Sequence, residues 1–374
     1  MSTIDWTILI TSLVFIVSYG VWKGRGSKDI NGYLMANRNI RWYIVALSVM
    51  ATQASAITFL STPGQAYSDG MRFVQFYFGL PLAMIVLSVT VIPIFHKLKV
   101  YTAYEYLENR FDMKTRGLAA VLFLIQRGFA AGLTIYAPSI ILSTLLGWNI
   151  YMTNLAIGVM VIIYTASGGS KAVSWTQTQQ MIIIMCAMAG AFYMVIHLLP
   201  QNVSFTDALY VAGKMGKLNA IDFSFDLNNR YNFWSGIIGG FFLALAYFGT
   251  DQSQVQRYLT GKSITHSRLG LLANGLVKVP MQFFILLLGA MVFVFYQFTA
   301  PPMFFNTVES QGVKESRYGQ EYRIIEQEYE AASKVKTELV KKLVDARHNG
   351  DDVELSVVET QLDRAEERAS DLRA

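Results

Sequence analysis

The sequence predicts an all-α integral membrane protein with about eight transmembrane helices and a helical hairpin outside the membrane. Three observations favour this fold class. The chain of 374 residues is 53% hydrophobic and 15% charged, whereas a soluble domain carries about 25% charged residues. Its mean hydropathy is +0.35. Apolar runs of membrane length recur before residue 300, and residues 309–374 then hold 11 Lys and Arg against 16 Asp and Glu.

Eight runs approach or exceed the ~20 apolar residues that a helix needs to cross a bilayer. They are residues 5–22, 42–66, 71–95, 117–146, 150–166, 173–199, 233–258 and 269–298. The first run lacks a basic region before it and a small-residue cleavage site after Tyr19-Gly20, so we interpret it as a span and not as a signal peptide. The Gly168-Gly169-Ser170-Lys171 segment lacks the spacing of a phosphate loop and predicts a tight turn between two spans.

Basic residues divide unequally between the two sides of the membrane. Loops 23–41, 96–116 and 257–268 hold many Lys and Arg, whereas loops 67–70, 147–149 and 199–232 hold few. The positive-inside rule places the basic loops in the cytoplasm. It therefore predicts a multi-pass protein of the cytoplasmic membrane whose N-terminus and residues 300–374 are extracytoplasmic.

Residue types that carry enzyme chemistry are sparse. Cys186 is the single cysteine and the four histidines are scattered, so disulfides and thiolate metal sites are excluded. The spans contain no paired carboxylates, no histidine cluster and no Ser/His/Asp arrangement. We therefore expect a protein that is not an enzyme and has no cofactor. The excess of positive charge reflects the orientation of the spans in the membrane, so we expect no nucleic-acid partner.

The second run is unusually polar for a membrane span. Residues 46–67, ALSVMATQASAITFLSTPGQAY, place Thr52, Gln53, Ser55 and Thr58 among apolar residues before Pro63-Gly64. An unsatisfied polar group in hydrocarbon costs several kcal/mol, so a helix that only crosses lipid has no use for them. Where a span is interrupted, its freed backbone carbonyls line a cavity and can coordinate an ion. This pattern indicates transport.

Residues 301–374 form a second predicted domain, an extracytoplasmic linker and helical hairpin that follows the membrane core of residues 1–300. Apolar residues recur at four- and three-residue steps from Tyr318 to Ala346 and again from Leu355 to Leu372. Between them, Gly350 can end one helix and Asp351 or Asp352 can cap the next. This predicts an antiparallel hairpin with a coiled-coil seam. We interpret this hairpin as a solvated helical insertion that carries no chemistry.

Four segments together resemble the sodium/solute symporter family. They are ATQASAITFLSTPGQAYSDG (51–70), TAYEYLENRF (102–111), GGSKAVSWTQTQQ (168–180) and GTDQSQVQRYLTGKS (249–263). The second is similar to a stretch of the iodide, monocarboxylate and vitamin branch, and the resemblance extends from residue 1 to about 306. It implies a leucine-transporter-type core of two inverted five-helix repeats after an extra N-terminal helix. Residues 42–199 would be the first repeat, and the last three helices of the second repeat would be absent, so we expect a C-terminally incomplete chain.

The resemblance also implies an ion site on the broken span. Its sodium-coordinating backbone carbonyls align with Ala51 and Ala54, and the remaining sodium ligands are hydroxyls of an eighth core helix beyond this chain. Close helix packing by small residues is the alternative for Ala51 and Ser55. Gln177 stands where many relatives have an aspartate that assists sodium binding, so a second sodium site is not expected.

For the solute, the resemblance aligns Tyr247 with an aromatic residue that closes the inner side of the site, and Lys278 with a lysine that hydrogen-bonds the solute. The full set of solute and gate candidates is Gln53, Ser55, Thr58, Tyr77, Tyr247 and Lys278. An intramembrane lysine faces a cavity or a partner. Snorkelling to the interface is the alternative for Lys278, and ordinary packing is the alternative for Tyr247. For Arg127, within the fourth run, we expect a structural role or a position at the membrane interface.

The predicted function is secondary active transport, in which sodium drives symport of a small organic solute or anion by alternating access. One sodium charge contributes about 2.3 kcal/mol per 100 mV of membrane potential. The expected partners are sodium, the solute and the lipid bilayer, and the sequence leaves the oligomeric state open. The alternative is a symporter-like membrane sensor of solute, joined to a signalling module beyond residue 374.

Overall fold

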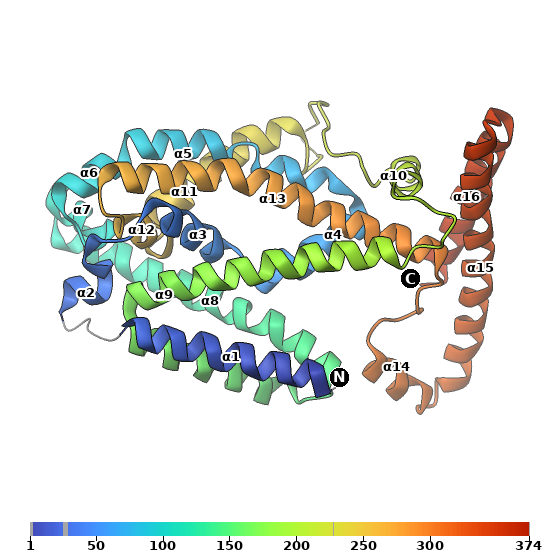
Figure 1. The fold of residues 1–374 in the computed structure, drawn as a ribbon, viewed down its shortest axis with the longest axis horizontal. Helices are drawn as coiled ribbons and strands as arrows, with labels where there is room; N and C mark the ends of the chain where they lie inside the picture. Colours follow the sequence, from blue (N-terminus) through green and yellow to red (C-terminus); the bar gives the residue numbers. More distant parts are fainter. Residues whose placement is uncertain (1–2, 25–28, 227, 374) are drawn as a thin grey trace. The chain divides into compact units, whose positions relative to one another are not determined.

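The computed structural model describes residues 3–24, 29–226 and 228–373, and its regular structure is helical (Figure 1). Residues 25–28 of the predicted basic loop 23–41 lie outside the described residues. The chain forms two compact units. The first comprises Met1–Thr62, Arg72–Ala187 and Ile221–Ile285, and the second comprises Pro63–Met71, Met188–Ala220 and Leu286–Ala374.

Most helices of the first unit fall within the apolar runs, whereas Ile30–Met35 and Ala103–Arg110 are short helices of the predicted loops 23–41 and 96–116. The helices of this unit are α1 (Thr3–Gly24), α2 (Ile30–Met35), α3 (Trp42–Gln53), α5 (Leu80–Val89), α6 (Val91–Leu98), α7 (Ala103–Arg110), α8 (Met113–Leu146), α11 (Gly240–Thr250) and α12 (Gln252–Leu259). Helices α9 (Ile150–His197) and α13 (Ile264–Phe298) begin in this unit and end in the second. The second unit adds α4 (Thr62–Asp69), α10 (Phe205–Lys214), α14 (Thr307–Lys314), α15 (Gly319–Asn349) and α16 (Asp352–Asp371).

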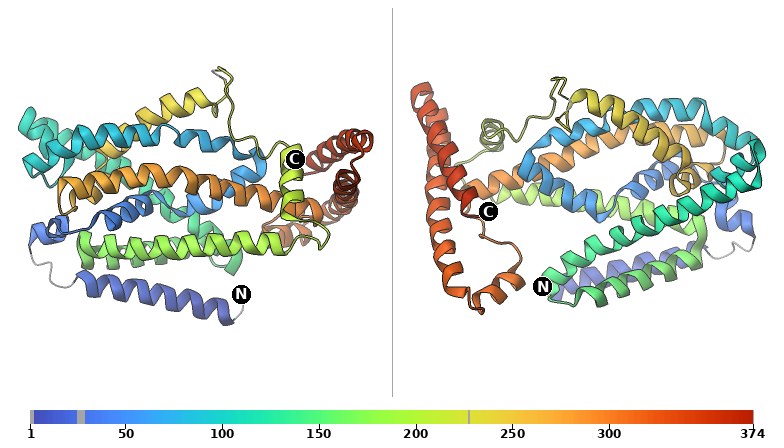
Figure 2. Two further views of the ribbon diagram at one scale, coloured as in Figure 1. Left: turned by 45° about the horizontal axis from the view of Figure 1, so that its top comes forward. Right: turned by 180° about the vertical axis from the view of Figure 1, so that it is seen from behind.

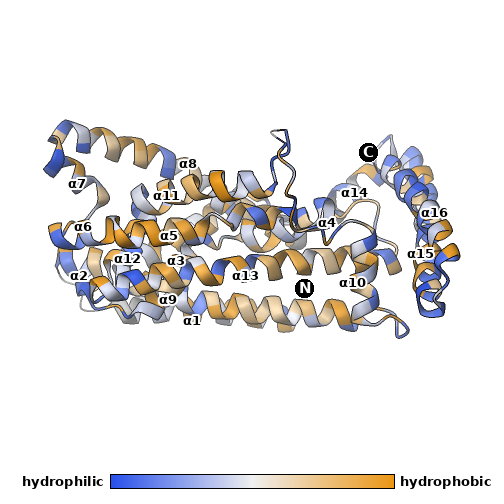
Figure 3. Ribbon diagram, turned by 90° about the horizontal axis from the view of Figure 1, so that it is seen from above, coloured by the Kyte–Doolittle hydropathy of each residue, from blue (hydrophilic) through white to orange (hydrophobic). Residues whose placement is uncertain are grey.

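Membrane-length helices confirm the predicted class. Within the described residues, five helices are long and apolar enough to cross a bilayer, and a bent pair counts as a sixth. The runs near 150–166 and 233–258 form the shorter apolar helices Ile150–Ile163 and Ser235–Thr250. The second of these stops early because Asp251 adopts an extended conformation and caps α12. Figure 3 shows mostly apolar colouring on α5, α11 and α13, whereas α15 and α16 are more polar.

The predicted turn at residues 168–171 is confirmed at Gly169. Its φ of 59° and ψ of −171° interrupt α9, whose two arms otherwise have continuous helical backbone. A Cβ atom at this position would lie 2.8 Å from the carbonyl oxygen of Tyr33. Only glycine combines this backbone conformation with so close an approach.

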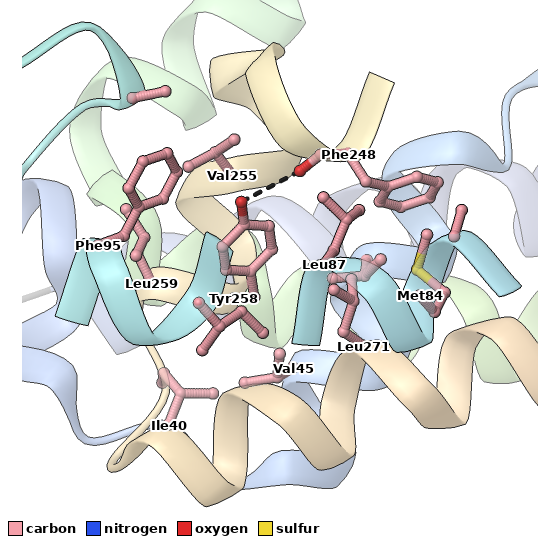
Figure 4. Packing of buried hydrophobic residues seen from close by; sticks show 14 of the residues in the cluster. Ile40, Val45, Met84, Leu87, Phe95, Phe248, Val255, Tyr258, Leu259 and Leu271 are labelled. Carbon is pink, nitrogen blue, oxygen red and sulfur yellow. Dashed lines mark hydrogen bonds between the residues drawn. The ribbon is translucent and has the colours of Figure 1, made fainter. Parts of the chain in front are cut away.

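Buried apolar side chains of α3, α5, α6, α12 and α13 join these helices in one core (Figure 4). Tyr258 of α12 is fully buried, and its hydroxyl donates a hydrogen bond of 3.1 Å to the carbonyl of Phe248 in α11. Val45, Leu87 and Leu271 lie in the same cluster. The hydroxyl bond satisfies the polar end of a ring that packing has removed from solvent.

Glycines bring α11 against the segment that leads into α5. A Cβ atom on Gly240 would collide with the carbonyl oxygen of Phe76, and one on Gly79 would collide with the backbone of Phe241. Gly239 has no atom within 4 Å of its Cβ position. The two backbones therefore approach as in small-residue packing of membrane helices.

This contact predicts opposite outcomes for two neighbouring substitutions. Gly240→Ala should lower stability by about 1–3 kcal/mol because the methyl group forces two backbones apart. Gly239→Ala should be neutral or slightly stabilising, because alanine has the higher helix propensity and the space is open. Thermal unfolding in detergent measures both, and equal melting temperatures for the two variants would contradict the close approach.

The predicted hairpin is present in the second unit. Helices α15 and α16 run antiparallel (Figure 2), Gly350 has a left-handed φ of 69°, and Asp351 caps α16 by accepting from the backbone N–H groups of Val353 and Glu354. The seam buries Tyr329, Leu339, Leu343, Ala346, Val358, Leu362 and Ala369. Tyr318 is 52% exposed and lies outside the seam because it occupies the N-cap position of α15.

Charged contacts hold the hairpin tip to α10. The buried Asp207 carboxylate accepts hydrogen bonds from Arg347 Nη1 at 2.9 Å and from His348 Nε2 at 3.1 Å. Asp207 also forms a capping box with Ser204 at the start of α10. A second ion pair joins Lys214 Nζ to Glu359 Oε1 at 2.6 Å. One carboxylate thus both starts α10 and fixes the hairpin tip.

Asp207→Asn should loosen this attachment by about 1–3 kcal/mol, because it removes charge from hydrogen bonds made to a buried group. Hydrogen exchange of the α10 amides should accelerate correspondingly. Glu330→Gln, which removes an exposed carboxylate of α15, is the matched control. Unchanged exchange in Asp207→Asn would contradict the assigned role.

The same contact has a defined pH dependence. Burial raises the pKa of Asp207, but hydrogen bonds from Ser204 and His348 outweigh it and hold the pKa below the usual 3.8. A lowered carboxyl pKa contributes stability above the unfolded value, and that stability is lost as the pH falls through the folded value. Protection of α10 should therefore persist at pH 5 and weaken only below pH 3.8.

Candidate solute and ion site

The predicted interruption of the second span falls at residues 54–56. Helix α3 ends at Gln53, Ala54 has φ −88° and ψ 82°, and the chain resumes as a π-helix at Ile57–Ser61, with a bend of 72° between the two halves. The last carbonyls of α3 lack their regular helical partners. The Ala51 carbonyl accepts from Ala54 N at 3.1 Å, and the Gln53 carbonyl accepts from the Thr58 hydroxyl at 3.1 Å.

Gln177 ties α9 to α3 one turn before this break. The Ser48 hydroxyl donates to Gln177 Oε1 at 2.7 Å, and Gln177 Nε2 donates to the Thr52 hydroxyl at 3.2 Å. The amide both donates and accepts, so it connects two hydroxyl-bearing side chains of one helix. Gln177 is thus a neutral bridge between α9 and α3.

A cavity of about 300 Å³ lies beside the break. It is lined by Gln53, Phe76, Tyr77, Leu80, Gly240, Leu243, Ala244, Tyr247 and Phe248. Three of the residues proposed from the sequence therefore meet: Gln53, Tyr77 and Tyr247. Within the described residues, Gln53 Oε1 is buried and has no hydrogen-bond partner, whereas the Tyr247 hydroxyl accepts from Gln254 Nε2 at 2.9 Å.

Lys278 is buried in the same unit with a 2% exposed side chain. Its ammonium nitrogen lies 5.8 Å from the centroid of the Tyr77 ring, and Tyr77 lines the cavity. Among the described residues, that nitrogen has no hydrogen-bond partner. Lys278 therefore lies inside the packed unit. Snorkelling would require its ammonium group to reach the surface, and it does not.

Five residues proposed from the sequence are outside the lining of this cavity: Ala51, Ala54, Ser55, Thr58 and Lys278. Thr58 is buried, and its hydroxyl is engaged by the Gln53 carbonyl as described above. The apolar lining residues were not identified from the sequence, because their pattern matches any buried helix. Gln254 could have been found, since it lies in the family-like segment 249–263.

The described residues contain no group of three or more His, Cys, Asp or Glu side chains that could hold a metal ion. The oxygens that the break offers are backbone carbonyls and hydroxyls. Hard cations prefer oxygen ligands of this kind. The cavity itself combines apolar walls, one free amide oxygen and a buried cation nearby, which suits a small molecule with a polar end.

The family model "Sodium:solute symporter family" matches residues 33–350. The sodium-coupled monocarboxylate transporter 1 of Xenopus laevis is 32% identical, over 72% of this chain and 44% of the relative. The human sodium/iodide cotransporter is 30% identical over 78% and 46%. The sodium-dependent multivitamin transporter of Oryctolagus cuniculus is 31% identical over 79% and 46%.

The chain thus spans a little under half the length of these curated relatives. A solved structure of a Na+-coupled sialic acid symporter superposes with a TM-score of 0.72 at 23% identity, covering 100% of this chain and 80% of that one. This likeness establishes the leucine-transporter-type fold. The matched family model covers most of the chain, so the chain belongs to the sodium:solute symporter family.

Proposed function

We propose that the protein carries out sodium-coupled symport of a small organic anion by alternating access. The observation that carries this proposal is the buried ammonium group of Lys278, which has no hydrogen-bond partner among the residues that the structure describes. It lies 5.8 Å from the centroid of the Tyr77 ring, and Tyr77 lines the 300 Å³ cavity. A buried charge is costly unless it is paired. A negatively charged solute would supply the missing partner.

The cavity walls support a solute with an apolar body and a single polar end. Phe76, Leu80 and Phe248 provide apolar surface, and Gln53 provides one free acceptor. Monocarboxylate and iodide, named for two of the relatives, are both anions. We infer that Lys278 binds the negative group while Tyr77 and Tyr247 enclose the remainder.

For sodium, we propose the backbone carbonyls of Ala51 and Ala54 at the break. A neutral oxygen site suits a monovalent hard cation, because the ion brings its own charge into a region without carboxylates. Gln177 supports the proposal by fixing α3 through Ser48 and Thr52 just before the break. Inward movement of sodium then drives the anion.

We place residues 1–300 as the membrane core and residues 301–374 as an extracytoplasmic linker and hairpin of a protein in the cytoplasmic membrane. The basic loops support this orientation. Alternating access would follow from movement of the broken helix and α11 against the remaining spans.

The sodium site predicts that Ala54→Val raises the sodium concentration for half-maximal uptake by about tenfold, because added bulk displaces the carbonyl from the ion. Ala51→Val should act in the same direction. Ala131→Val on the exposed face of α8 is the control. Sodium-dependent uptake of a panel of labelled monocarboxylates measures the effect. An unchanged sodium requirement would contradict the assignment of Ala51 and Ala54 as sodium ligands.

The anion site predicts that Lys278→Met abolishes uptake without harming the fold. Replacing a buried unpaired cation by an apolar side chain of similar length should leave the melting temperature equal or higher. Uptake efficiency for carboxylates should fall by at least about a hundredfold, which corresponds to about 2.7 kcal/mol. Lys262→Met, at an exposed lysine, is the control, and normal uptake by Lys278→Met would contradict the proposal.

A further inference from the structure

A second, larger cavity adjoins the candidate solute cavity. Its volume is about 720 Å³, and its lining comes from α6, α7, α8 and α11. Leu243 and Tyr247 line both cavities, so these two side chains of α11 lie at their shared border. The larger cavity presents aromatic rings on several sides, including Phe95, Tyr104 and Phe123. A solute that passes Tyr247 would enter this space.

One ion pair lies at this cavity. Arg127, near the middle of α8, places Nη1 at 3.6 Å from Oδ2 of Asp251. Asp251 lines the cavity, as does Gln126, whereas Arg127 reaches it only through its contact with Asp251. A separation of 3.6 Å is an electrostatic contact and not a hydrogen bond. An arginine inside a span is costly and in general marks a pathway or a partner.

The Asp251 carboxylate does not depend on Arg127 alone. Its Oδ1 accepts from the backbone N–H of Ser253 at 2.8 Å, and it caps the first turn of α12. Hydrogen bonds and the helix dipole stabilise a carboxylate at that position. Arg127 could therefore change partners without leaving Asp251 unsatisfied.

We propose that the larger cavity is a second binding station for the anionic solute, in which Arg127 exchanges Asp251 for the solute's carboxylate. This rests on the proposed transport of an anion. The guanidinium group binds carboxylates with two parallel hydrogen bonds, which is a better contact than the 3.6 Å pair it would replace. The aromatic walls select a carboxylate with an apolar or aromatic body.

The test separates the two stations by removing the first. Purified Lys278→Met protein is titrated with benzoate, and with benzyl alcohol as the neutral probe, by isothermal calorimetry. Residual benzoate binding is expected. Adding Arg127→Gln should weaken that binding by about tenfold, and adding Asp251→Asn should strengthen it by about tenfold, because Arg127 is then released while asparagine still caps α12. Binding of benzyl alcohol should not change.

Arg116→Gln is the matched control, since Arg116 lies on the same helix and pairs with Glu105 and Glu108. Neither of these carboxylates lines the cavity, whereas Asp251, the partner of Arg127, does. The proposed second binding site would be contradicted if Lys278→Met protein bound no benzoate. It would also be contradicted if adding Arg127→Gln or Arg116→Gln to that protein gave equal benzoate affinity. If Arg127→Gln does not fold, the Asp251→Asn variant provides the test, and an unchanged affinity for benzoate in that variant would contradict the second site as well. Sodium-dependent benzoate uptake by the unsubstituted protein is scored separately, and its absence counts against the proposed function.

Discussion

The interruption of a membrane-length helix between Gln53 and Ile57 is the constraint on which the first unit depends. A backbone that leaves the helix inside hydrocarbon must find polar partners or line a cavity. Here the Thr58 hydroxyl and the Ala54 N–H donate hydrogen bonds to the carbonyls of Gln53 and Ala51, and Gln53 also lines the 300 Å³ cavity. Gln177 holds the last turn before the break through two hydroxyl groups. The broken geometry is thus supported by named side chains on both sides.

Close packing of glycines gives the cavity its opposite wall. Because Gly79 and Gly240 have no side chains, α11 approaches the segment before α5 closely enough for backbone atoms to touch. That approach positions Tyr77 and Ala244 along the same space. Two cationic side chains within the apolar runs, Lys278 and Arg127, contact Tyr77 and Asp251, which line two cavities that share Tyr247. Their cost in an apolar environment is the reason to connect them with an anionic solute.

The second unit follows different physics, because its helices α15 and α16 carry polar outer faces and an apolar seam. Asp207, Arg347 and His348 fix the hairpin tip to α10, and Lys214 adds a second ion pair with Glu359. Contacts of this kind are specific in direction and sensitive to pH, whereas the seam of Leu339, Leu343 and Leu362 is neither.

Local sequence patterns were sufficient for the all-helical membrane class, the turn at Gly169, the break after Gln53, and the hairpin with its Gly350 and Asp351 signals, whereas runs 150–166 and 233–258 form helices shorter than a span. Each depends on short-range chemistry: run length, backbone freedom of glycine, or capping by a neighbouring side chain. The meeting of Gln53, Tyr77 and Tyr247 was expected only through family resemblance, and the partners of Gln177 and Arg127 were not expected at all. Contacts such as Ser48 with Gln177, 129 residues apart, have no local pattern. Tertiary packing alone determines them, because the distance between two helices is set by every side chain between them.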